Sequence, residues 1–567
     1  MKRHKFYFIC LIGLSLLVSS CSKKADLGET LETEIPKLME AADIPGMSVA
    51  VIREGAIFWS GVFGVRSRKT NEPVVENTVF EAASLTKTIT AAAALKLVER
   101  GELELDLPLA EYLPYPKLAG DERYKKITAR HVLTHTTGLP NWGTKLLREP
   151  GERYGYSGEG FLYLGHVVEE ISGMPLKGFA KNEIFDPLGM TRTSYIWQDR
   201  FSGNIAIGHD RHGFAGQLRQ QSEENGGASL LTTARDYAAF LCAILNDLVL
   251  KPETIDMMLT PQVKATKMGE EDGPDEHISW GFGWGIQPGE TENGFFHWGD
   301  NGILRAYTVA YKGRKEGLCM FANSENFFTV ADSLVALILK DHQYALDWLE
   351  YKRLDDPERS AFMNVEKAFL EKGKEAGLAA LEEMKDQNPG LLKTEEITEM
   401  AQYLAQQDKV AEAEGILLGV LDAKPDSGAA WASLGMLYLD MSRYEDAYER
   451  FQKAMELDAD NPYANVAMPW VKELIEAEKK SVTVPAEMLE KYAGDYGPRH
   501  IRLREGRLYY QRDEGKEYEL IPLSEYTFSL KEKGTFRIRF MMDDNGNTVK
   551  VLGLYLGGRM DESLRNQ

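Results

Sequence analysis

The change of hydrophobic period along the chain constrains its fold more than any other feature. Between about Leu27 and Leu346, stretches that alternate at every second residue mix with stretches at helical spacing. From about Pro357 to Lys480 the alternation is absent, and from Val482 onward it returns without helical spacing. The chain's 567 residues are also too many for a single domain, since a domain has about 150 residues. The expected parts are an N-terminal segment 1–21 and domains at 27–346, 357–480 and 482–567.

The N-terminal segment has the pattern of an export signal. A basic start, MKRHK, precedes the apolar run Phe6–Val18, which is shorter than the ~20 residues that span a bilayer. Cys21 follows in VSSC, which resembles the lipobox of bacterial lipoproteins, whose cysteine is lipidated. The resemblance implies an exported protein of the bacterial cell envelope, anchored by lipid and facing the periplasm. The alternative is ordinary signal cleavage nearby, with Cys21 incidental.

Charge and cysteine content narrow the possible functions. The net charge of −21, without a long block of Lys or Arg, argues against nucleic acid as a partner. Outside the N-terminal segment only Cys242 and Cys319 remain, too few for a disulfide framework, and we expect both to be small buried apolar residues. His209 and His212 have no Cys, His or carboxylate partner set. We therefore expect no metal and no cofactor.

Strand signals occur at both ends of the first domain. Met47–Val65 predicts two strands around a turn at Arg53-Glu54-Gly55, and Leu304–Asn323 predicts a second hairpin. Helical spacing runs from Ser84 to Arg100, before Gly101, and again over Thr329–His342. Strands at both ends with helices between them predict an α+β fold, in which the two ends meet in one sheet and a helical insertion lies between them.

The second and third domains differ from the first. Ala429–Pro462 contains large and small residues at fixed offsets, and this spacing resembles the tetratricopeptide repeat (TPR). A weaker unit stands 34 residues earlier and a more degenerate one at 361–389, so we expect TPR-like α-hairpins that offer a surface to a protein partner; the alternative is a plain helical spacer. After 482, hairpin turns at Glu505-Gly506 and Asn545-Gly546 predict a small antiparallel β-domain.

Ser84 and Lys87 lie three positions apart, where a polar turn runs into an alanine-rich helix. Residues at this spacing share a helix face, so the amine can reach the hydroxyl. A serine becomes a nucleophile when a base takes its proton, and burial lowers the pKa of a lysine toward the ~7–8 that such a base needs. The apolar residues that follow Lys87 indicate burial. The alternative is a helix start, with Ser84 as the cap and Lys87 in solvent.

Further motifs follow in order: HVLTHTTGLP at His131–Pro140, Tyr156-Ser157-Gly158, and His297-Trp298-Gly299. Together with Ser84-x-x-Lys87, this set resembles the penicillin-binding, class C β-lactamase-like serine hydrolases over about residues 32–326. The resemblance implies an α/β sandwich with a β-lactamase/transpeptidase-like antiparallel sheet, flanked by helices, and an all-helical subdomain. It also implies that Ser84 forms the acyl-enzyme, that Lys87 accepts its proton and that Tyr156 is the second acid/base.

The same resemblance assigns the lining of the site. His297 and Gly299 belong to the edge-strand motif, and we expect Gly299 to leave room for a substrate backbone. The backbone amides of Ser84 and Asp300 are the implied oxyanion hole. His135 belongs to a family signature, and the favoured interpretation is a structural histidine in a turn.

Gly158 departs from the family pattern, which has an asparagine that hydrogen-bonds the substrate amide and steadies the lysine. Glycine does neither by its side chain, which argues against β-lactam hydrolysis but not against acyl transfer. Glu159 is either a partial substitute or, as we favour, a solvated carboxylate. We therefore expect a serine hydrolase for small amides or esters, such as D-amino-acid peptides, cell-wall fragments or simple esters. The alternative is a catalytically weak envelope protein that docks a partner through its TPR-like region.

Overall fold

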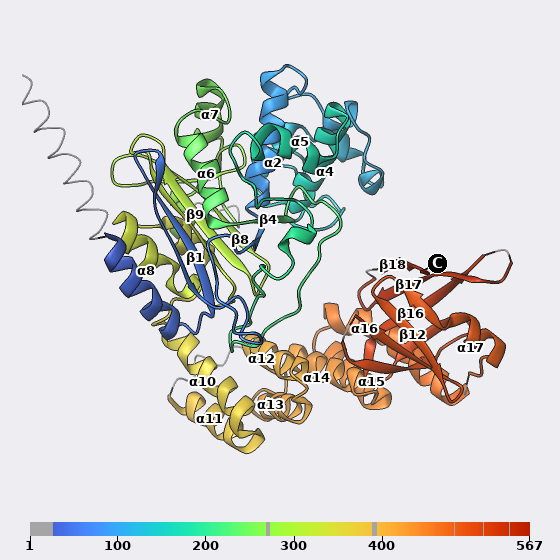
Figure 1. The fold of residues 1–567 in the computed structure, drawn as a ribbon. Helices are drawn as coiled ribbons and strands as arrows, with labels where there is room; N and C mark the ends of the chain where they lie inside the picture. The colour runs from blue at the N-terminus through green and yellow to red at the C-terminus, as the bar shows by residue number, and fades with distance from the viewer. Residues whose placement is uncertain are drawn as a thin grey trace, which may run out of the picture. The chain divides into compact units, whose positions relative to one another are not determined.

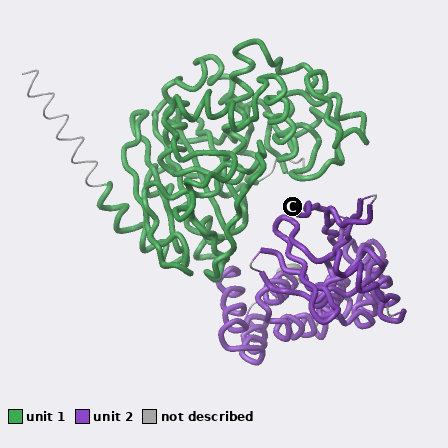
Figure 2. Tube along the Cα trace, turned by 45° about the vertical axis from the view of Figure 1, so that its right-hand side comes forward, with its two compact units in different colours: residues 1–356 green, residues 357–567 purple. Residues whose placement is uncertain are grey.

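The computed structural model describes residues 27–267, 273–387, 394–480, 482–513, 515–543, 545–558 and 560–566. The chain divides into two compact units, residues 1–356 and 357–567 (Figure 2). The predicted export signal and Cys21 lie outside the described residues, so export and lipidation stay predictions. Within the described ranges, no helix is both long and apolar enough to cross a membrane.

Unit 1 is built on an eight-stranded antiparallel sheet in the order β2-β1-β10-β9-β8-β7-β6-β5. The N-terminal hairpin pairs with the C-terminal one through β1 and β10, where Met47 stands opposite Ala322. The expectation that both ends of this domain share one sheet is therefore confirmed. The strands are β1 Gly46–Arg53, β2 Ala56–Gly64, β5 Val263–Lys264, β6 Ser279–Trp280, β7 Gly285–Gln287, β8 Gly294–Asp300, β9 Arg305–Tyr311 and β10 Glu316–Ala322.

Alternating side chains of the sheet supply two apolar cores. In β1, Ala50 and Ile52 join the core on one face, whereas Val49 and Val51 join the core on the other. The first core includes helices α2 Thr86–Glu99, α4 Gly158–Ser172 and α6 Ala234–Leu245; the second includes the helix over 27–41, α8 Phe328–Leu339 and α9 Tyr344–Leu349 (Figure 1). The result is the expected α+β sandwich, with α2 and α4 in the helical insertion.

A short second pair of strands, β3 Phe80–Ala83 and β4 Leu230–Thr232, leads into α2. The remaining helices of unit 1 are α3 Ala129–Leu133, α5 Leu176–Ala180 and α7 Pro252–Leu259. Short 3₁₀ turns lie at Leu109–Glu111, Pro116–Leu118, Glu122–Lys126, Asp199–Phe201 and Gly273–His277, with a π turn at Lys181–Phe185.

Unit 2 begins with a run of helices that pack as neighbouring pairs. In the pair α14–α15, a Cβ on Gly435 would meet the Phe451 ring at 2.8 Å, so the glycine lets the two helices approach closely. This contact fits the predicted repeat spacing, whose assignment as TPR stays a prediction. The helices are α10 Pro357–Lys372, α11 Lys374–Gln387, α12 Thr394–Gln406, α13 Val410–Ala423, α14 Gly428–Asp440, α15 Tyr444–Leu457 and α16 Pro462–Lys480.

The C-terminal β-domain is an antiparallel meander of eight strands, entered through helix α17 Ala486–Tyr492. The amide of Asn566 donates to the carbonyl oxygen of Asp495 at 2.8 Å, which brings the end of the chain to the first strand and gives a small barrel-like domain. Its strands are β11 Gly494–Tyr496, β12 Arg499–Arg504, β13 Arg507–Arg512, β14 Glu517–Pro522, β15 Thr527–Leu530, β16 Lys533–Met542, β17 Thr548–Tyr555 and β18 Met560–Leu564.

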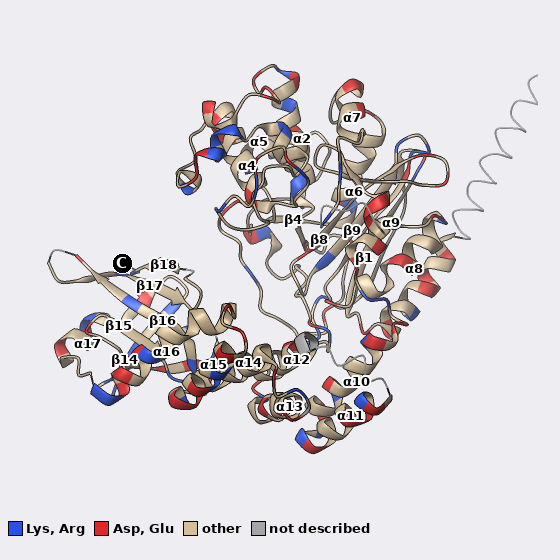
Figure 3. Ribbon diagram, turned by 180° about the vertical axis from the view of Figure 1, so that it is seen from behind, with Lys and Arg blue, Asp and Glu red and all other residues tan. Residues whose placement is uncertain are grey.

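The helices and the β-domain of unit 2 are in direct contact. The indole nitrogen of Trp470 donates to the carbonyl oxygen of Gly534 at 2.7 Å, and the Thr535 hydroxyl donates to Asp440 at 2.8 Å. Part of the helical surface is thus covered by the chain's own β-domain. Acidic and basic residues are interspersed along the helices of this unit (Figure 3).

Candidate active site

Ser84 lies in the turn between β3 and α2, one residue before the helix cap. Helix α2 starts at Thr86, and its N-cap, Leu85, makes no side-chain capping bond. The alternative in which Ser84 caps this helix is therefore wrong. Its hydroxyl oxygen instead lies 3.0 Å from the side-chain nitrogen of Lys87. Ala83, directly before it, has a left-handed φ of 46°, a strained conformation for a residue with a Cβ.

Lys87 is fully buried, so the alternative of a solvated lysine is also wrong. Its Nζ donates to the carbonyl oxygen of Gly227 at 2.7 Å and lies 4.8 Å from the ring centroid of Tyr156. Burial lowers the pKa of Lys87 from 10.5 to about 7. A large neutral fraction is therefore available near neutral pH, and this fraction can take the proton of Ser84.

Tyr156 presents a buried phenol to the same site. Its hydroxyl oxygen is enclosed and makes no regular hydrogen bond with the described residues. Burial raises the pKa of the phenol, and the nearby Ser84 side chain lowers it in part. Tyr156 therefore stays protonated at neutral pH unless a transient partner takes its proton, as a proton relay requires.

His297 lies on β8, and its ring is buried against the site. Its Nδ1 donates to the carbonyl oxygen of Trp298 at 2.8 Å, and its Nε2 is buried without a partner among the described residues. Burial, with a smaller effect of the Lys87 charge, lowers the pKa of His297 to about 3. The imidazole is therefore neutral wherever Lys87 can act as a base, and it lines the site without donating a proton as an acid.

Gly299 also serves the fold. A Cβ at this position would lie under 3.0 Å from the carbonyl oxygen of Ala82 on β3. The space on the Cβ side of Gly299 is therefore filled by β3, the strand that leads to Ser84, and room for a substrate backbone along the edge of β8 stays a prediction. Asp300 is the last residue of β8. Its carboxylate accepts a hydrogen bond from the Tyr351 hydroxyl and forms an ion pair with Arg305 at 3.2 Å.

His135 holds the segment that carries Tyr156. It is buried, with a left-handed φ of 56°, and its Nδ1 accepts from the amide of Ser157 at 3.0 Å. Its carbonyl oxygen accepts from the amide of Gly155 at 2.7 Å. Burial, and then the charges of Lys87 and His297, hold the pKa of His135 well below 6.5. These contacts support the interpretation as a structural histidine.

Glu159 follows Gly158 in the first turn of α4, and it is buried, with 6% of its surface exposed. The expectation of a solvated carboxylate is therefore wrong. Its carboxylate faces the Tyr115 hydroxyl at 3.5 Å, and burial with the Glu159 charge raises the pKa of that phenol. The Lys87 nitrogen is hydrogen-bonded to Ser84 and to Gly227, whereas the Glu159 carboxylate is turned to Tyr115. Glu159 therefore does not replace the asparagine in steadying the lysine.

Two residues that the sequence reasoning missed shape the site. The carbonyl of Gly227 is a hydrogen-bond partner of Lys87, and the ring of Trp142 lies 5.8 Å from the same nitrogen. The Gly-Gly pair at 226–227 signals a turn, but no local pattern connects it with Lys87.

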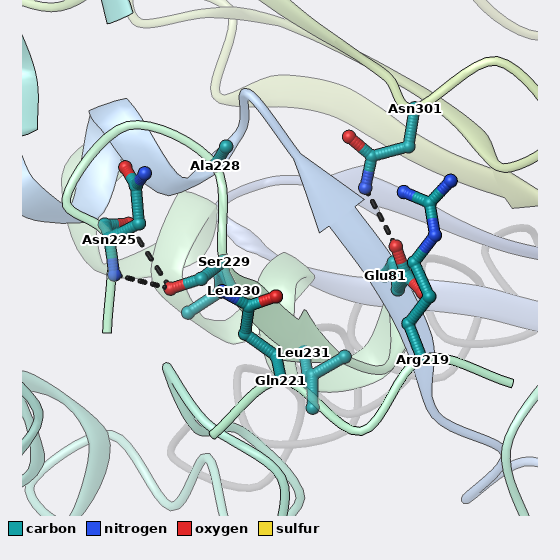
Figure 4. A pocket seen from close by; sticks show the side chains of 9 residues that line it. All are labelled: Glu81, Arg219, Gln221, Asn225, Ala228, Ser229, Leu230, Leu231 and Asn301. Atoms are coloured by element: carbon teal, nitrogen blue, oxygen red, sulfur yellow. Dashed lines mark hydrogen bonds between the residues drawn. The ribbon is translucent and has the colours of Figure 1, made fainter. Parts of the chain in front are cut away.

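A pocket of about 180 Å³ lies along β3 and the 219–231 segment (Figure 4). Glu81 and Asn301 are joined at one end, where the Asn301 amide donates to Glu81 at 2.7 Å. Burial raises the pKa of Glu81, while Asn301 and the charge of Arg219 lower it. The lining residues are Glu81, Arg219, Gln221, Asn225, Ala228, Ser229, Leu230, Leu231 and Asn301. Within the described ranges, no group of His, Cys, Asp and Glu is arranged to hold a metal ion.

Comparison with known proteins matches the part of the chain that contains Ser84, Lys87, Tyr156 and His297. The Beta-lactamase family model matches residues 31–340, more than half of the chain. Esterase EstB of Burkholderia gladioli is 31% identical over 206 residues, which cover 30% of this chain and 52% of the esterase. A beta-lactamase of Pseudomonas fluorescens is 26% identical over 282 residues, which cover 46% of this chain and 75% of that protein. The chain thus spans about half the length of the esterase.

Among solved structures, the octameric penicillin-binding protein homologue from Pyrococcus abyssi aligns with a TM-score of 0.48 and 19% identity. The alignment covers 94% of this chain and 99% of that chain.

Proposed function

The chain belongs to the Beta-lactamase family of serine hydrolases, and we propose that it hydrolyses small esters or amides through an acyl-enzyme on Ser84. One observation carries the proposal: Lys87 is fully buried, lies 3.0 Å from the Ser84 hydroxyl, and has a pKa lowered to about 7. A lysine in this state is a base at neutral pH, and the Ser84 hydroxyl is hydrogen-bonded to it.

The proposed reaction proceeds in two halves. Neutral Lys87 takes the proton of Ser84 while its Oγ bonds to the substrate carbonyl carbon, which forms a tetrahedral oxyanion. The amides of Ser84 and Asp300 are the proposed oxyanion donors, and loss of one such donor in hydrolases costs ~2.7–4 kcal/mol. Tyr156 passes its proton to the leaving alcohol or amine and regains one from Lys87. Water then attacks the acyl-enzyme, the same groups return the proton to Ser84, and the acid is released.

A fluorophosphonate probe tests the nucleophile directly. We expect the wild-type protein to be labelled and to hydrolyse p-nitrophenyl esters, and the Ser84→Ala variant to do neither. An intact protein that resists every acylating probe would overturn the proposal. A screen of D-peptides, aryl esters and nitrocefin would then identify the preferred substrate.

The rival function is that of a catalytically weak envelope protein with a protein partner at its TPR-like helices. Gly158 is the observation that favours it, because the family asparagine is absent. A full-length protein that is labelled at Ser84 but turns over no ester or amide would support this rival over the enzyme.

We also propose that the protein is exported and lipid-anchored through Cys21, on the strength of the VSSC pattern after an apolar run. Metabolic labelling with palmitate in a bacterial host should mark the wild-type protein and not a Cys21→Ser variant. Equal labelling of both would rule out lipidation at this cysteine.

A further inference from the structure

Gly158 occupies a position that has no room for a side chain. A Cβ there would lie 2.7 and 2.8 Å from two ring carbons of Trp142, and 2.9 Å from the carbonyl oxygen of Asn141. Distances under 3.0 Å require a neighbour to move. The Asn141 carbonyl is fixed, because the amides of Gly158 and Glu159 both donate to it, at 2.8 and 2.9 Å. An asparagine at position 158 therefore requires the indole to move.

Trp142 fills the space that this side chain would take. Its ring lies 5.8 Å from the Lys87 nitrogen, and its edge lies 3.3 Å from the position of a Cβ on Gly227. The indole thus stands between the start of α4 and the segment that holds Lys87. With 48% of its surface exposed, it is also a large apolar side chain that is accessible to solvent.

The two tasks of the family asparagine are separated in this chain. The Gly227 carbonyl, 2.7 Å from Nζ, already steadies Lys87. Position 158 itself offers no side-chain amide to bond a substrate amide, and an apolar ring stands in its place. A polar group of a substrate pressed against this ring loses its water without gaining a hydrogen bond, whereas an apolar group gains contact area.

We propose that Trp142 and Gly158 act as one specificity-determining pair, in which the indole forms an apolar wall beside Lys87. This wall selects esters with an apolar acyl or alcohol group, and disfavours β-lactams and other substrates whose amide must be hydrogen-bonded there. The inference rests on the proposed function, and it names the substrate class of the same site.

The test compares kcat/KM for p-nitrophenyl butyrate and for nitrocefin in four proteins: wild type, Trp142→Ala, Gly158→Asn and the double variant. We expect the wild type to prefer the ester. Loss of the indole in Trp142→Ala should lower kcat/KM for the ester on the order of tenfold, mainly through KM. Gly158→Asn alone should lower the ester activity, because its side chain displaces the indole. The double variant should gain on the order of tenfold or more in nitrocefin activity over Gly158→Asn alone.

Phe214→Ala is the matched control, because Phe214 is a half-exposed aromatic residue of the same unit, and it should change neither substrate's kcat/KM. Trp142→Phe keeps an aromatic wall and should retain most of the ester activity. If Gly158→Asn fails to fold and the double variant folds, the result supports a steric clash between the side chain at position 158 and the Trp142 ring. If neither folds, the comparison of Trp142→Ala with Trp142→Phe decides the question.

Unchanged ester activity in Trp142→Ala would overturn the proposal. So would a double variant whose kcat/KM changes by the product of the two single-variant factors, because the two residues would then act independently. Fluorophosphonate labelling separates this failure from that of the proposed function. If the wild type is labelled at Ser84 but substitution of Trp142 changes neither activity, only the specificity inference fails. If the wild type is not labelled, the proposed hydrolase function fails.

Discussion

The side-chain nitrogen of Lys87 lies 2.7 Å from the carbonyl oxygen of Gly227, a residue 140 positions further along the chain. Its other partner, the Ser84 hydroxyl at 3.0 Å, is also uncharged. A protonated amine here would be buried without an ion-paired carboxylate from the part of the chain that the structure describes, and burial lowers the pKa of Lys87 to about 7. The contact thus holds an amine that is largely neutral above pH 7 against the Ser84 hydroxyl.

The pH dependence of kcat/KM should follow the ionisation of Lys87. We expect kcat/KM for an aryl ester to rise with pH, with a midpoint near 7, because only the neutral amine accepts the Ser84 proton. His297, whose pKa is about 3, remains neutral over this range and adds no step. Initial rates between pH 5 and 9 at low substrate concentration measure the profile. A rate that is independent of pH from 5 to 9 would contradict the assignment.

Replacement of Lys87 should stabilise the fold on the acidic side. Between pH 7 and 10.5 the unfolded chain binds a proton at Lys87 that the folded chain does not, so this residue makes wild-type stability rise with pH. Below about pH 7 both states are protonated and the full burial penalty remains. The free energy of unfolding of the wild type, relative to that of Lys87→Met, should therefore rise by about 3 kcal/mol from pH 6 to pH 9. Urea unfolding at the two pH values measures this difference, and an equal gap at both would contradict it.

Much of the site could be predicted because its residues stand in short local motifs. Ser84 and Lys87 lie within one turn of chain, and Tyr156 and His297 each stand in a tripeptide with its own pattern. The missed contact, between Lys87 and Gly227, joins two segments that come together only in the folded unit. Its acceptor is a backbone carbonyl, which every residue has, so residue type carries no signal for it.

The same distinction between local and long-range contacts applies to the fold. The hairpin β1–β2 could be predicted because its alternation and its turn are local. Strands β5 and β6 have two residues each, too short for a period to show. Closure of the β-domain depends on the hydrogen bond between Asn566 and Asp495, which joins the last and first segments of this domain. A local hairpin pattern cannot predict a contact over this separation.

Removal of the Tyr156 hydroxyl should slow the chemistry without loss of the fold. Its oxygen makes no regular hydrogen bond among the described residues, so Tyr156→Phe leaves no buried partner unsatisfied. We expect kcat for an aryl ester to fall by about 10²–10⁴, the usual contribution of a positioned acid/base. The melting temperature should stay close to that of the wild type. Stopped-flow or steady-state kinetics and a thermal melt test both, and an undiminished kcat would exclude Tyr156 from the proton relay.

A methyl group at Gly299 should damage both stability and activity, because it would force β8 away from β3, the strand that leads to Ser84. The added Cβ would lie under 3.0 Å from the Ala82 carbonyl oxygen and 3.4 Å from the Cβ of Ala83. Such overpacking typically costs ~1–3 kcal/mol, and we expect Gly299→Ala to lose that much free energy of unfolding together with most of its esterase rate. Gly178→Ala is the matched control: nothing lies within 4 Å of its added Cβ, and this helical substitution should be neutral or stabilise by up to ~1 kcal/mol. Chemical unfolding and ester hydrolysis of the two variants, side by side, decide the point, and a Gly299→Ala protein as stable and active as the control would show that β3 and β8 can separate freely.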